Sequence, residues 1–191
     1  RGLNSNLLEL CKTVWTSNFQ GQKICSIINL QQYDRIISLI NEAVQKGGRW
    51  CPLEVDSVGN WHSIDNNVYR ISIGLLLNAN HTMEIMQQEI FGPVLPVMEY
   101  DTFDQLLNIM QIIPRPLAMY LFTEKTKNQE LFATNTISGA LCFNNTIVYA
   151  AQENLPFGGI GNSGMGCYRG SYGFETFSYL KPIYRQSKLN I

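Results

Sequence analysis

A glycine-rich stretch between Pro156 and Gly166 contains the most distinctive grouping of residue types in the chain. It holds five glycines in eleven residues, and glycine serves where backbone φ is positive or where the backbone approaches another group closely. Gly159–Gly164 also matches G-x-G-x-x-G, a pattern that can hold a dinucleotide pyrophosphate. That chemistry needs a preceding strand, a following helix and an acidic residue about 20 positions later, where this chain has Tyr184. The pattern therefore favours a shaped surface turn over a dinucleotide site.

Five cysteines supply the other groups that could do chemistry, because a thiolate is a strong nucleophile. They stand at Cys11, Cys25, Cys51, Cys142 and Cys167, and no two form a C-x-x-C pair. Their odd number argues against a disulfide framework and predicts reduced thiols in the cytoplasm. A free cysteine can also pack simply as a small apolar residue.

Composition excludes several classes of function. The chain has 191 residues, of which 45% are hydrophobic and 15% charged, and a net charge of −1. Its length suits one domain with a substantial core, and its charge offers no field for nucleic acid or an anionic membrane. No apolar run reaches the roughly 18 residues of a membrane span, and no signal-peptide pattern opens the chain. Because the chain begins at Arg1 rather than Met, we expect it to be part of a longer protein.

The first half of the chain predicts a helix, a loop and a strand. Residues 35–46 place apolar side chains on one helical face, and Gly47–Gly48 can end that helix. Residues 51–68 are polar and aperiodic, which indicates an exposed loop or a poorly ordered insert. Residues 69–78 are β-branched and apolar, which favours a buried strand.

The second half alternates helices and strands. Thr102–Gln105 forms a capping-box pattern in front of a helix that Pro114 ends. Residues 117–122 are a continuous apolar run typical of a buried parallel strand, residues 125–134 indicate a polar helix, and residues 140–149 another strand. This alternation predicts an α/β fold with a mainly parallel sheet flanked by helices.

Three motifs follow one another between Met86 and Ser178. They are Met86–Val94 (MQQEIFGPV), Pro116–Thr123 (PLAMYLFT), and the glycine-rich stretch Leu155–Gly166 followed by Gly173–Ser178. In this order and at about this spacing they resemble the class 3, fatty-aldehyde type, of the aldehyde dehydrogenase family.

The resemblance is good over residues 70–180 and poor over residues 1–69. It implies a partial aldehyde dehydrogenase catalytic domain over residues 1–178, and an oligomerisation strand or tail over residues 179–191. It also implies that the family's N-terminal cofactor-binding domain has no counterpart in this chain. The fold expected on this basis is the C-terminal part of the catalytic domain.

The activity that the resemblance implies is the oxidation of an apolar aldehyde to its acid with NAD or NADP. In this family a cysteine thiolate attacks the aldehyde, hydride passes to the cofactor, and water hydrolyses the thioester. The segment around that cysteine is echoed here by Trp15, Phe19, Gly21, Gln22 and Cys25. Cys25 is thus the candidate nucleophile, although two residues separate it from Gln22 where the family has one. The alternative is that Cys25 packs as a small apolar residue.

The same resemblance assigns contacts to the cofactor and the substrate. Glu89 corresponds to the glutamate that holds the nicotinamide ribose hydroxyls, and Phe91 to the phenylalanine near the nicotinamide ring. Phe157 corresponds to a phenylalanine of the aldehyde tunnel, where an aromatic side chain suits a long-chain or aromatic aldehyde. The alternatives are a solvated acid at Glu89 and ordinary core packing at Phe157.

Two parts of the family pattern are missing. The general-base glutamate of the motif E-L-G-G has no counterpart, and only nine residues separate Cys25 from Arg35, which implies an internal deletion. We therefore expect the isolated chain not to oxidise aldehydes, and to bind NAD(P) weakly or not at all. Its expected partners are a second copy of the chain or, for a non-catalytic remnant, a full-length relative.

Overall fold

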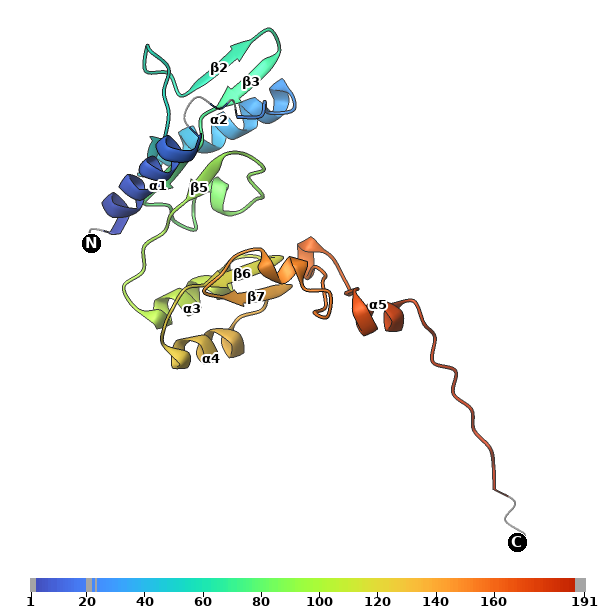
Figure 1. The fold of residues 1–191 in the computed structure, drawn as a ribbon. Coiled ribbons are helices and arrows are strands. Elements are labelled where there is room, and N and C mark those ends of the chain that lie inside the picture. The colour runs from blue at the N-terminus through green and yellow to red at the C-terminus, as the bar shows by residue number, and fades with distance from the viewer. Residues whose placement is uncertain (1–2, 20–21, 23, 188–191) are drawn as a thin grey trace. The chain divides into compact units, whose positions relative to one another are not determined.

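The computed structural model of the chain describes residues 3–19, 22 and 24–187. The chain divides into two compact units, Arg1–Asp101 and Thr102–Ile191, and most of their helices and strands are labelled in Figure 1. The α/β class predicted from the sequence is confirmed, since each unit combines helices with strands.

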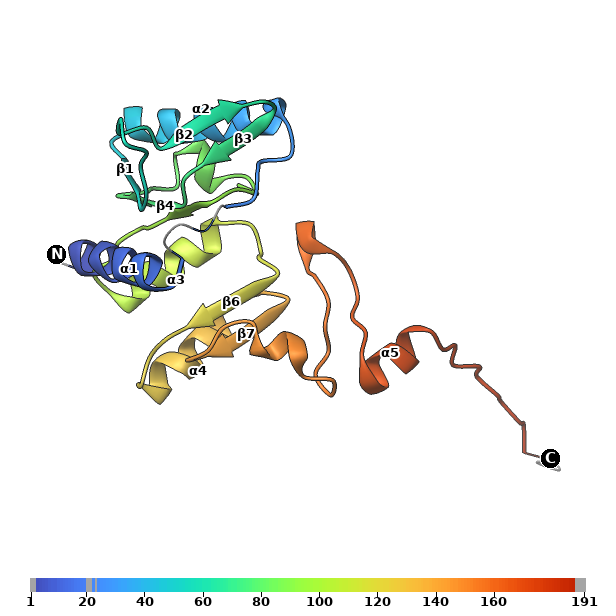
Figure 2. The ribbon, with the colours of Figure 1, turned by 45° about the horizontal axis from the view of Figure 1, so that its top comes forward.

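A mixed three-stranded sheet and a hairpin form the strands of the first unit. The sheet has the order β1-β4-β5, in which β1 is antiparallel and β5 parallel to the central β4. The hairpin joins β2 and β3, which lie side by side in Figure 2. The elements in chain order are α1 (Leu3–Phe19), α2 (Leu30–Gln45), β1 (Arg49–Pro52), β2 (His62–Asp65), β3 (Val68–Ile71), β4 (Gly74–Leu77), the 3₁₀ turn η1 (Glu84–Met86) and β5 (Val94–Pro96).

Helix α2 supplies one side of the core of this unit. Its N-cap is Asn29, whose side chain accepts a hydrogen bond from the backbone N–H of Gln32 at 2.9 Å, so the helix starts five residues before the predicted 35–46 segment. The apolar face expected from the sequence is confirmed at Ile36, Ile40 and Ala43, which are buried, but not at Val44, which is exposed. The buried residues of this core are Tyr33, Ile36, Leu39, Ile40, Ala43, Ile71, Leu76, Ala79, Met83, Ile85 and Val94.

The prediction of a loop over residues 51–68 is wrong, because this segment contains the end of β1, the whole of β2 and the first residue of β3. The hairpin turn places Asn66 and Asn67 at φ values of 47° and 64°. Two successive left-handed residues make the turn that matches the twist of antiparallel strands, and asparagine tolerates that conformation. The predicted strand 69–78 is likewise divided into β3 and β4.

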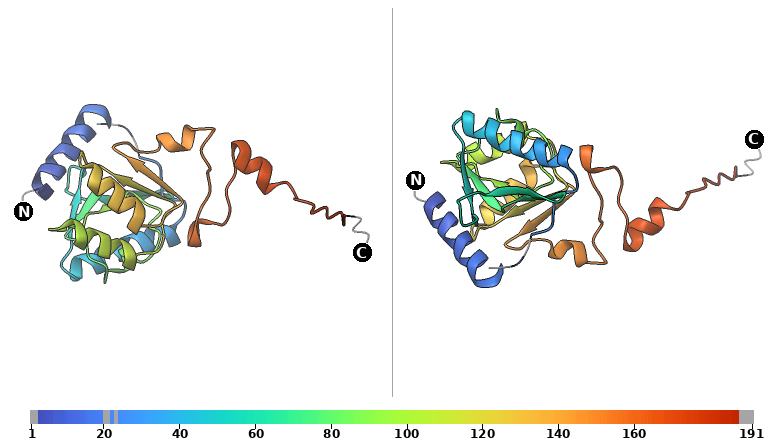
Figure 3. Two further views of the ribbon diagram at one scale, coloured as in Figure 1. Left: turned by 90° about the horizontal axis from the view of Figure 1, so that it is seen from below. Right: turned by 90° about the horizontal axis from the view of Figure 1, so that it is seen from above.

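Two parallel strands with two helices form the folded part of the second unit. Strands β6 and β7 pair in parallel, and α3 and α4 lie side by side against them (Figure 3). The elements are α3 (Phe103–Ile112), β6 (Ala118–Leu121), α4 (Thr126–Asn135), β7 (Ala140–Phe143), the 3₁₀ turns η2 (Val148–Ala151) and η3 (Gly161–Ser163), and α5 (Gly170–Thr176). The small core consists of Met119, Leu121 and Phe132.

The predicted elements of this unit are confirmed with changed ends. The capping interaction forms as expected, because Thr102 accepts a hydrogen bond from the backbone N–H of Gln105 at 3.2 Å. The strand predicted over residues 140–149 ends at Phe143, and a positive φ of 54° at Asn144 turns the chain there. The sheets of the chain as a whole are therefore mixed, with two parallel and two antiparallel strand pairs among the described residues.

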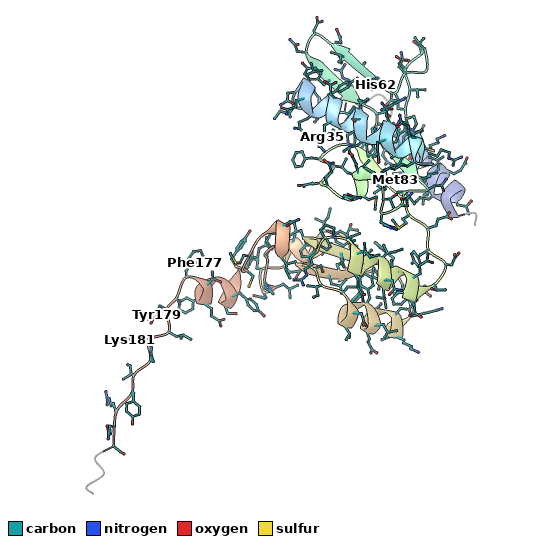
Figure 4. The ribbon with its side chains drawn as sticks, turned by 180° about the vertical axis from the view of Figure 1, so that it is seen from behind. Arg35, His62, Met83, Phe177, Tyr179 and Lys181 are labelled. Atoms are coloured by element: carbon teal, nitrogen blue, oxygen red, sulfur yellow. The ribbon has the colours of Figure 1, made fainter. Side chains whose placement is uncertain are left out.

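Residues 179–187 contain neither helix nor strand. Their apolar side chains are exposed, including Tyr179 at 86% and Leu180 at 92%. Figure 4 labels Tyr179 and Lys181 at the start of this segment, and Phe177 just before it. An oligomerisation strand forms only when it pairs with a second subunit, and the structure describes a single chain. The oligomerisation strand over residues 179–191 therefore stays a prediction. Its last four residues lie outside the described ranges.

Candidate cofactor and substrate site

A turn between η1 and β5 carries the two residues that the sequence assigned to the cofactor. Phe91 has a positive φ of 50°, and its side chain is 83% exposed. Glu89 is exposed, and no described residue donates a hydrogen bond to its carboxylate. Both carboxylate oxygens are therefore free to accept from a ligand, which fits a pair of ribose hydroxyls.

The backbone of this turn is attached to helix α2. Arg35 Nη2 donates to the carbonyl oxygen of Ile90 at 2.5 Å, and Nη1 to that of Glu89 at 3.3 Å. Two residues further on, Gly92 lies so close to Ile36 that an added Cβ would stand 2.7 Å from the Ile36 Cδ1 atom. The turn is thus held on both sides of Phe91 while the Glu89 and Phe91 side chains face outward.

Cys25 lies in the segment between α1 and α2. Its side chain is exposed in this chain, whereas the packing alternative expects a buried thiol. Its thiol makes no hydrogen bond with a described residue, whereas the chain just after it is anchored to β3. The backbone N–H of Ile27 donates to the carbonyl oxygen of Tyr69 at 2.8 Å, and the backbone N–H of Tyr69 donates to Ser26 Oγ at 2.9 Å.

Cys25, Glu89 and Phe91 belong to the first unit, and Phe157 belongs to the second. No hydrogen bond joins the Cys25 thiol to the Glu89 carboxylate among the residues that the structure describes. The nucleophile and ribose-ligand roles of these residues therefore stay predictions, supported in each case by an accessible functional group.

Phe157 packs in an aromatic cluster. Its ring stacks on that of Tyr149, with centroids 6.0 Å apart, and meets the edge of Tyr168 at 5.7 Å. The guanidinium of Arg169 lies 4.6 Å from the centroid of the Phe157 ring, and the Phe157 and Tyr168 backbones pair through two hydrogen bonds. The packing alternative thus describes part of what this ring does, and its role at an aldehyde remains a prediction.

The glycine-rich stretch lines a cleft of about 890 Å³ in the second unit. Its G-x-G-x-x-G match does not open a helix, because only the three-residue turn η3 occurs at Gly161–Ser163. Gly159 lies against the backbone of Ser163 and Gly164, so the glycines close the turn on itself. The expectation of a shaped turn rather than a dinucleotide site agrees with this geometry.

An aromatic cluster that the sequence analysis did not single out lies on the other side of α2. The hydroxyl of Tyr33 is 2.6 Å from Nδ1 of His62, and the rings of Trp61 and Tyr69 contact His62 and Tyr33 respectively. Burial, and secondarily the negative charge of Asp34, raises the pKa of the Tyr33 phenol above its usual 10.0. Next to the cluster, Trp61, His62 and Arg70 help to line an open cleft of about 290 Å³.

Two kinds of feature are absent from the described residues. They contain no group of three or more His, Cys, Asp or Glu side chains placed to hold a metal ion. Within the same residues, no helix is both long enough and apolar enough to cross a bilayer.

Comparison with known sequences identifies the family. The model of the aldehyde dehydrogenase family matches residues 7–183. A coniferyl aldehyde dehydrogenase of Pseudomonas sp. is 38% identical over 162 residues, which are 85% of this chain and 33% of the relative. Aldehyde dehydrogenase family 3 member H1 of Arabidopsis thaliana is 32% identical over 180 residues, 94% of this chain and 35% of the relative. The chain thus spans about a third of the length of these curated relatives.

Solved structures agree with this assignment. The substrate-bound state of Staphylococcus aureus AldH superposes with a TM-score of 0.74 at 32% identity, and the match covers 99% of this chain and 39% of that one. An indole-3-acetaldehyde dehydrogenase in complex with NAD+ shares the fold with a TM-score of 0.76 at 23% identity, over 95% of this chain and 36% of its own. The chain therefore belongs to the aldehyde dehydrogenase family, and class 3 members are among its relatives.

Proposed function

We propose that the chain is the C-terminal part of an aldehyde dehydrogenase catalytic domain that oxidises apolar aldehydes to acids with NAD or NADP, and that it does not catalyse this reaction alone. The observation that carries the proposal is the turn of Glu89 and Phe91, whose backbone is anchored to α2. The turn presents an exposed ring and a carboxylate that has no hydrogen-bond partner among the described residues. Relatives named for aldehydes support the reaction class. The aromatic surroundings of Phe157 suit an apolar substrate.

The residues that would hold the cofactor belong to its nicotinamide end. The Glu89 carboxylate would accept hydrogen bonds from both ribose hydroxyls, and the Phe91 ring would lie near the nicotinamide. The bound cofactor supplies an acceptor for hydride. A dinucleotide-binding G-x-G-x-x-G motif also requires a helix directly after its glycines. The described residues have only a three-residue 3₁₀ turn there, so we expect low affinity for the whole dinucleotide.

Cys25 would provide the thiolate that attacks the aldehyde carbon, and Phe157 an apolar wall for the rest of the substrate. The thiol must lose its proton, and the glutamate that serves the family as base has no counterpart here. Glu9, on the exposed side of α1, lacks the Gly-Gly that follows the family's base. Because nucleophile and base act as a unit in catalysis, the chain alone is expected to be inactive.

Calorimetry with NAD+ and NADP+ tests the cofactor part of this proposal. We expect binding of the isolated chain to be weak, with little heat, and any measurable heat to be reduced in the variant Glu89→Ala. The matched control is Glu84→Ala, which removes a carboxylate from the same segment five residues earlier. Micromolar binding that Glu89→Ala abolishes would show that the chain carries a complete site, contrary to the proposal.

A second candidate function is that of a non-catalytic subunit that pairs with a full-length relative in the cytoplasm. The observation that favours it is the run of exposed apolar residues after α5, including Tyr179, Leu180, Ile183 and Tyr184. Residues 179–191 would act as the oligomerisation strand and residues 1–178 as the partial catalytic domain, and the five free thiols suit a reducing compartment. Co-sedimentation with a full-length class 3 enzyme, lost when residues 179–191 are removed, is the expected result. Equal co-sedimentation of the shortened chain would contradict it.

A further inference from the structure

A polar stripe along helix α2 bonds at two separate places to the segment that leads to Glu89. Arg35, Glu42 and Lys46 are spaced by seven and four residues, which places them on one side of the helix. At the far end of the stripe, Lys46 Nζ donates to the carbonyl oxygen of Thr82 at 2.7 Å, and the backbone N–H of Glu84 donates to Glu42 Oε2 at 3.2 Å. Arg35 forms the near end, beside the turn itself. Figure 4 labels Arg35 on the helix.

The guanidinium of Arg35 is fixed before it reaches the turn. Its Nε donates to Gln32 Oε1 at 2.8 Å, one helical turn earlier, while Nη1 reaches the side-chain oxygen of Gln88 at 3.2 Å and the carbonyl oxygen of Glu89 at 3.3 Å. Nη2 donates to the carbonyl oxygen of Ile90 at 2.5 Å. A planar fork with five donors can serve these acceptors together, whereas an ammonium group is a point charge.

The carboxylate of Glu89 depends on this backbone for its direction. No described residue bonds to the Glu89 side chain, so the carboxylate takes its place from the main chain of residues 88–92. Ile90 packs against the core of the first unit, and Gly92 lies against Ile36. Between these two apolar contacts, Arg35 supplies the polar link between the helix and the turn.

We propose that Arg35 is a positioning residue, which fixes the turn of Glu89 and Phe91 on α2 and thereby aims the Glu89 carboxylate at a ribose. The part concerning the ribose rests on the proposed function above. The part concerning the turn stands on the hydrogen bonds of Arg35 alone. A side chain held in this way binds with less loss of conformational entropy than a mobile one.

Limited digestion of the full chain with chymotrypsin, read by mass spectrometry, tests the positioning of the turn. Phe91 is an exposed cleavage site whose rate depends on local opening of the turn. Phe177 is 89% exposed beyond the last helix and serves as the internal standard in the same tube. We expect cleavage at Phe91, relative to cleavage at Phe177, to rise about tenfold in Arg35→Ala, which corresponds to about 1.4 kcal/mol of local stability.

Three comparisons make the outcome decisive. Arg35→Lys keeps the positive charge and the helix propensity but lacks the planar guanidinium that serves several acceptors at once. We therefore expect it to behave like Arg35→Ala. Lys46→Ala removes the other end of the stripe and is expected to leave cleavage at Phe91 unchanged. Unchanged cleavage in both Arg35 variants, or an equal rise in Lys46→Ala, would overturn the positioning role. A parallel rise at the half-buried Tyr69 would mean that the whole unit had opened, and would also count against it.

Saturation-transfer NMR with nicotinamide mononucleotide separates this inference from the proposed function. We expect transfer to the ribose protons in the unchanged chain, and its loss in Glu89→Gln and Arg35→Lys. No transfer in the unchanged chain would contradict the cofactor role of Glu89, while the digestion would still decide on Arg35. Transfer that Glu89→Gln abolishes and Arg35→Lys leaves intact would contradict the aiming role of Arg35.

Discussion

The side chains of Glu89 and Phe91 are exposed, whereas the Arg35 side chain donates hydrogen bonds to the backbone of the same turn. The motif around Glu89 allowed the first two residues to be predicted as candidates, because their types carry the chemistry. Arg35 could not be predicted, since it bonds to carbonyl oxygens 54 and 55 residues away, and a carbonyl is the same at every residue. The spacing of Arg35, Glu42 and Lys46 on one helix side is the signal that the sequence did contain.

Tyr33 gives a pH-dependent prediction for a single residue. Its raised folded pKa means that the neutral phenol stabilises the fold, and this stability is present below the unfolded pKa near 10 and is lost as pH rises through the folded pKa. We expect Tyr33→Phe to lose about 1 kcal/mol near pH 7, because the hydrogen bond to His62 is gone. The variant should also show a smaller loss of stability above about pH 10 than the unchanged chain.

Urea unfolding at about pH 7 and about pH 11 measures both effects. Tyr69→Phe, whose ring centroid lies 5.9 Å from that of Tyr33, is the matched control and should keep the alkaline loss. An alkaline loss of the same size in Tyr33→Phe would contradict the assignment to this phenol.

Elements with a local signal were predicted well, and elements set by long-range pairing were not. Helix α3 was predicted because Thr102 caps it and Pro114 follows it, and both residues lie within two positions of the helix ends in the sequence. The β2–β3 hairpin was missed because its turn is Asn66–Asn67, without the glycine that marks most such turns, and because four of its eight strand residues are polar or charged, namely His62, Ser63, Asp65 and Arg70. Tertiary pairing with β1 and β5, rather than residue type, also sets where β4 begins.

Alanine substitutions of two glycines, one in the glycine-rich turn and one in α5, are predicted to change the free energy of unfolding in opposite directions. A Cβ at Gly159 would overlap the Ser163 carbonyl and stand 2.7 Å from the backbone nitrogen of Gly164, so Gly159→Ala must shift backbone and should cost about 1–3 kcal/mol. Gly173 lies inside α5 with its nearest neighbours at 3.8 Å. There alanine has room and favours the helix, and Gly173→Ala should stabilise by about 0.5–1 kcal/mol. Urea unfolding of both variants checks this, and a neutral Gly159→Ala would refute the close approach.

At the scale of the whole molecule, the chain exposes apolar surface that a folded protein usually covers. The side chains of Phe174, Phe177, Leu180 and Tyr184 are 77%, 89%, 92% and 86% exposed, and β6 and β7 form a sheet of two strands. Open strand edges and apolar patches drive association. We therefore expect the chain to self-associate at micromolar concentration.

Analytical ultracentrifugation measures this association, with a chain shortened after Ser178 as the comparison. The shortened chain should show less association, because it lacks the exposed residues of the tail. A single monomeric species for the full chain, unchanged by the shortening, would reject the assembly role of residues 179–191.

The central claim is that this member of the aldehyde dehydrogenase family contributes part of a site and does not turn over aldehydes alone. The most direct measurement is NAD(P)H formation by the isolated chain, supplied with NAD+ or NADP+ and a medium-chain or aromatic aldehyde. We predict a rate no higher than that of Cys25→Ala, because the chain lacks a base for the Cys25 thiol and lacks most of the residues that would contact the cofactor. Turnover that Cys25→Ala abolishes and the control Cys167→Ala retains would contradict the account.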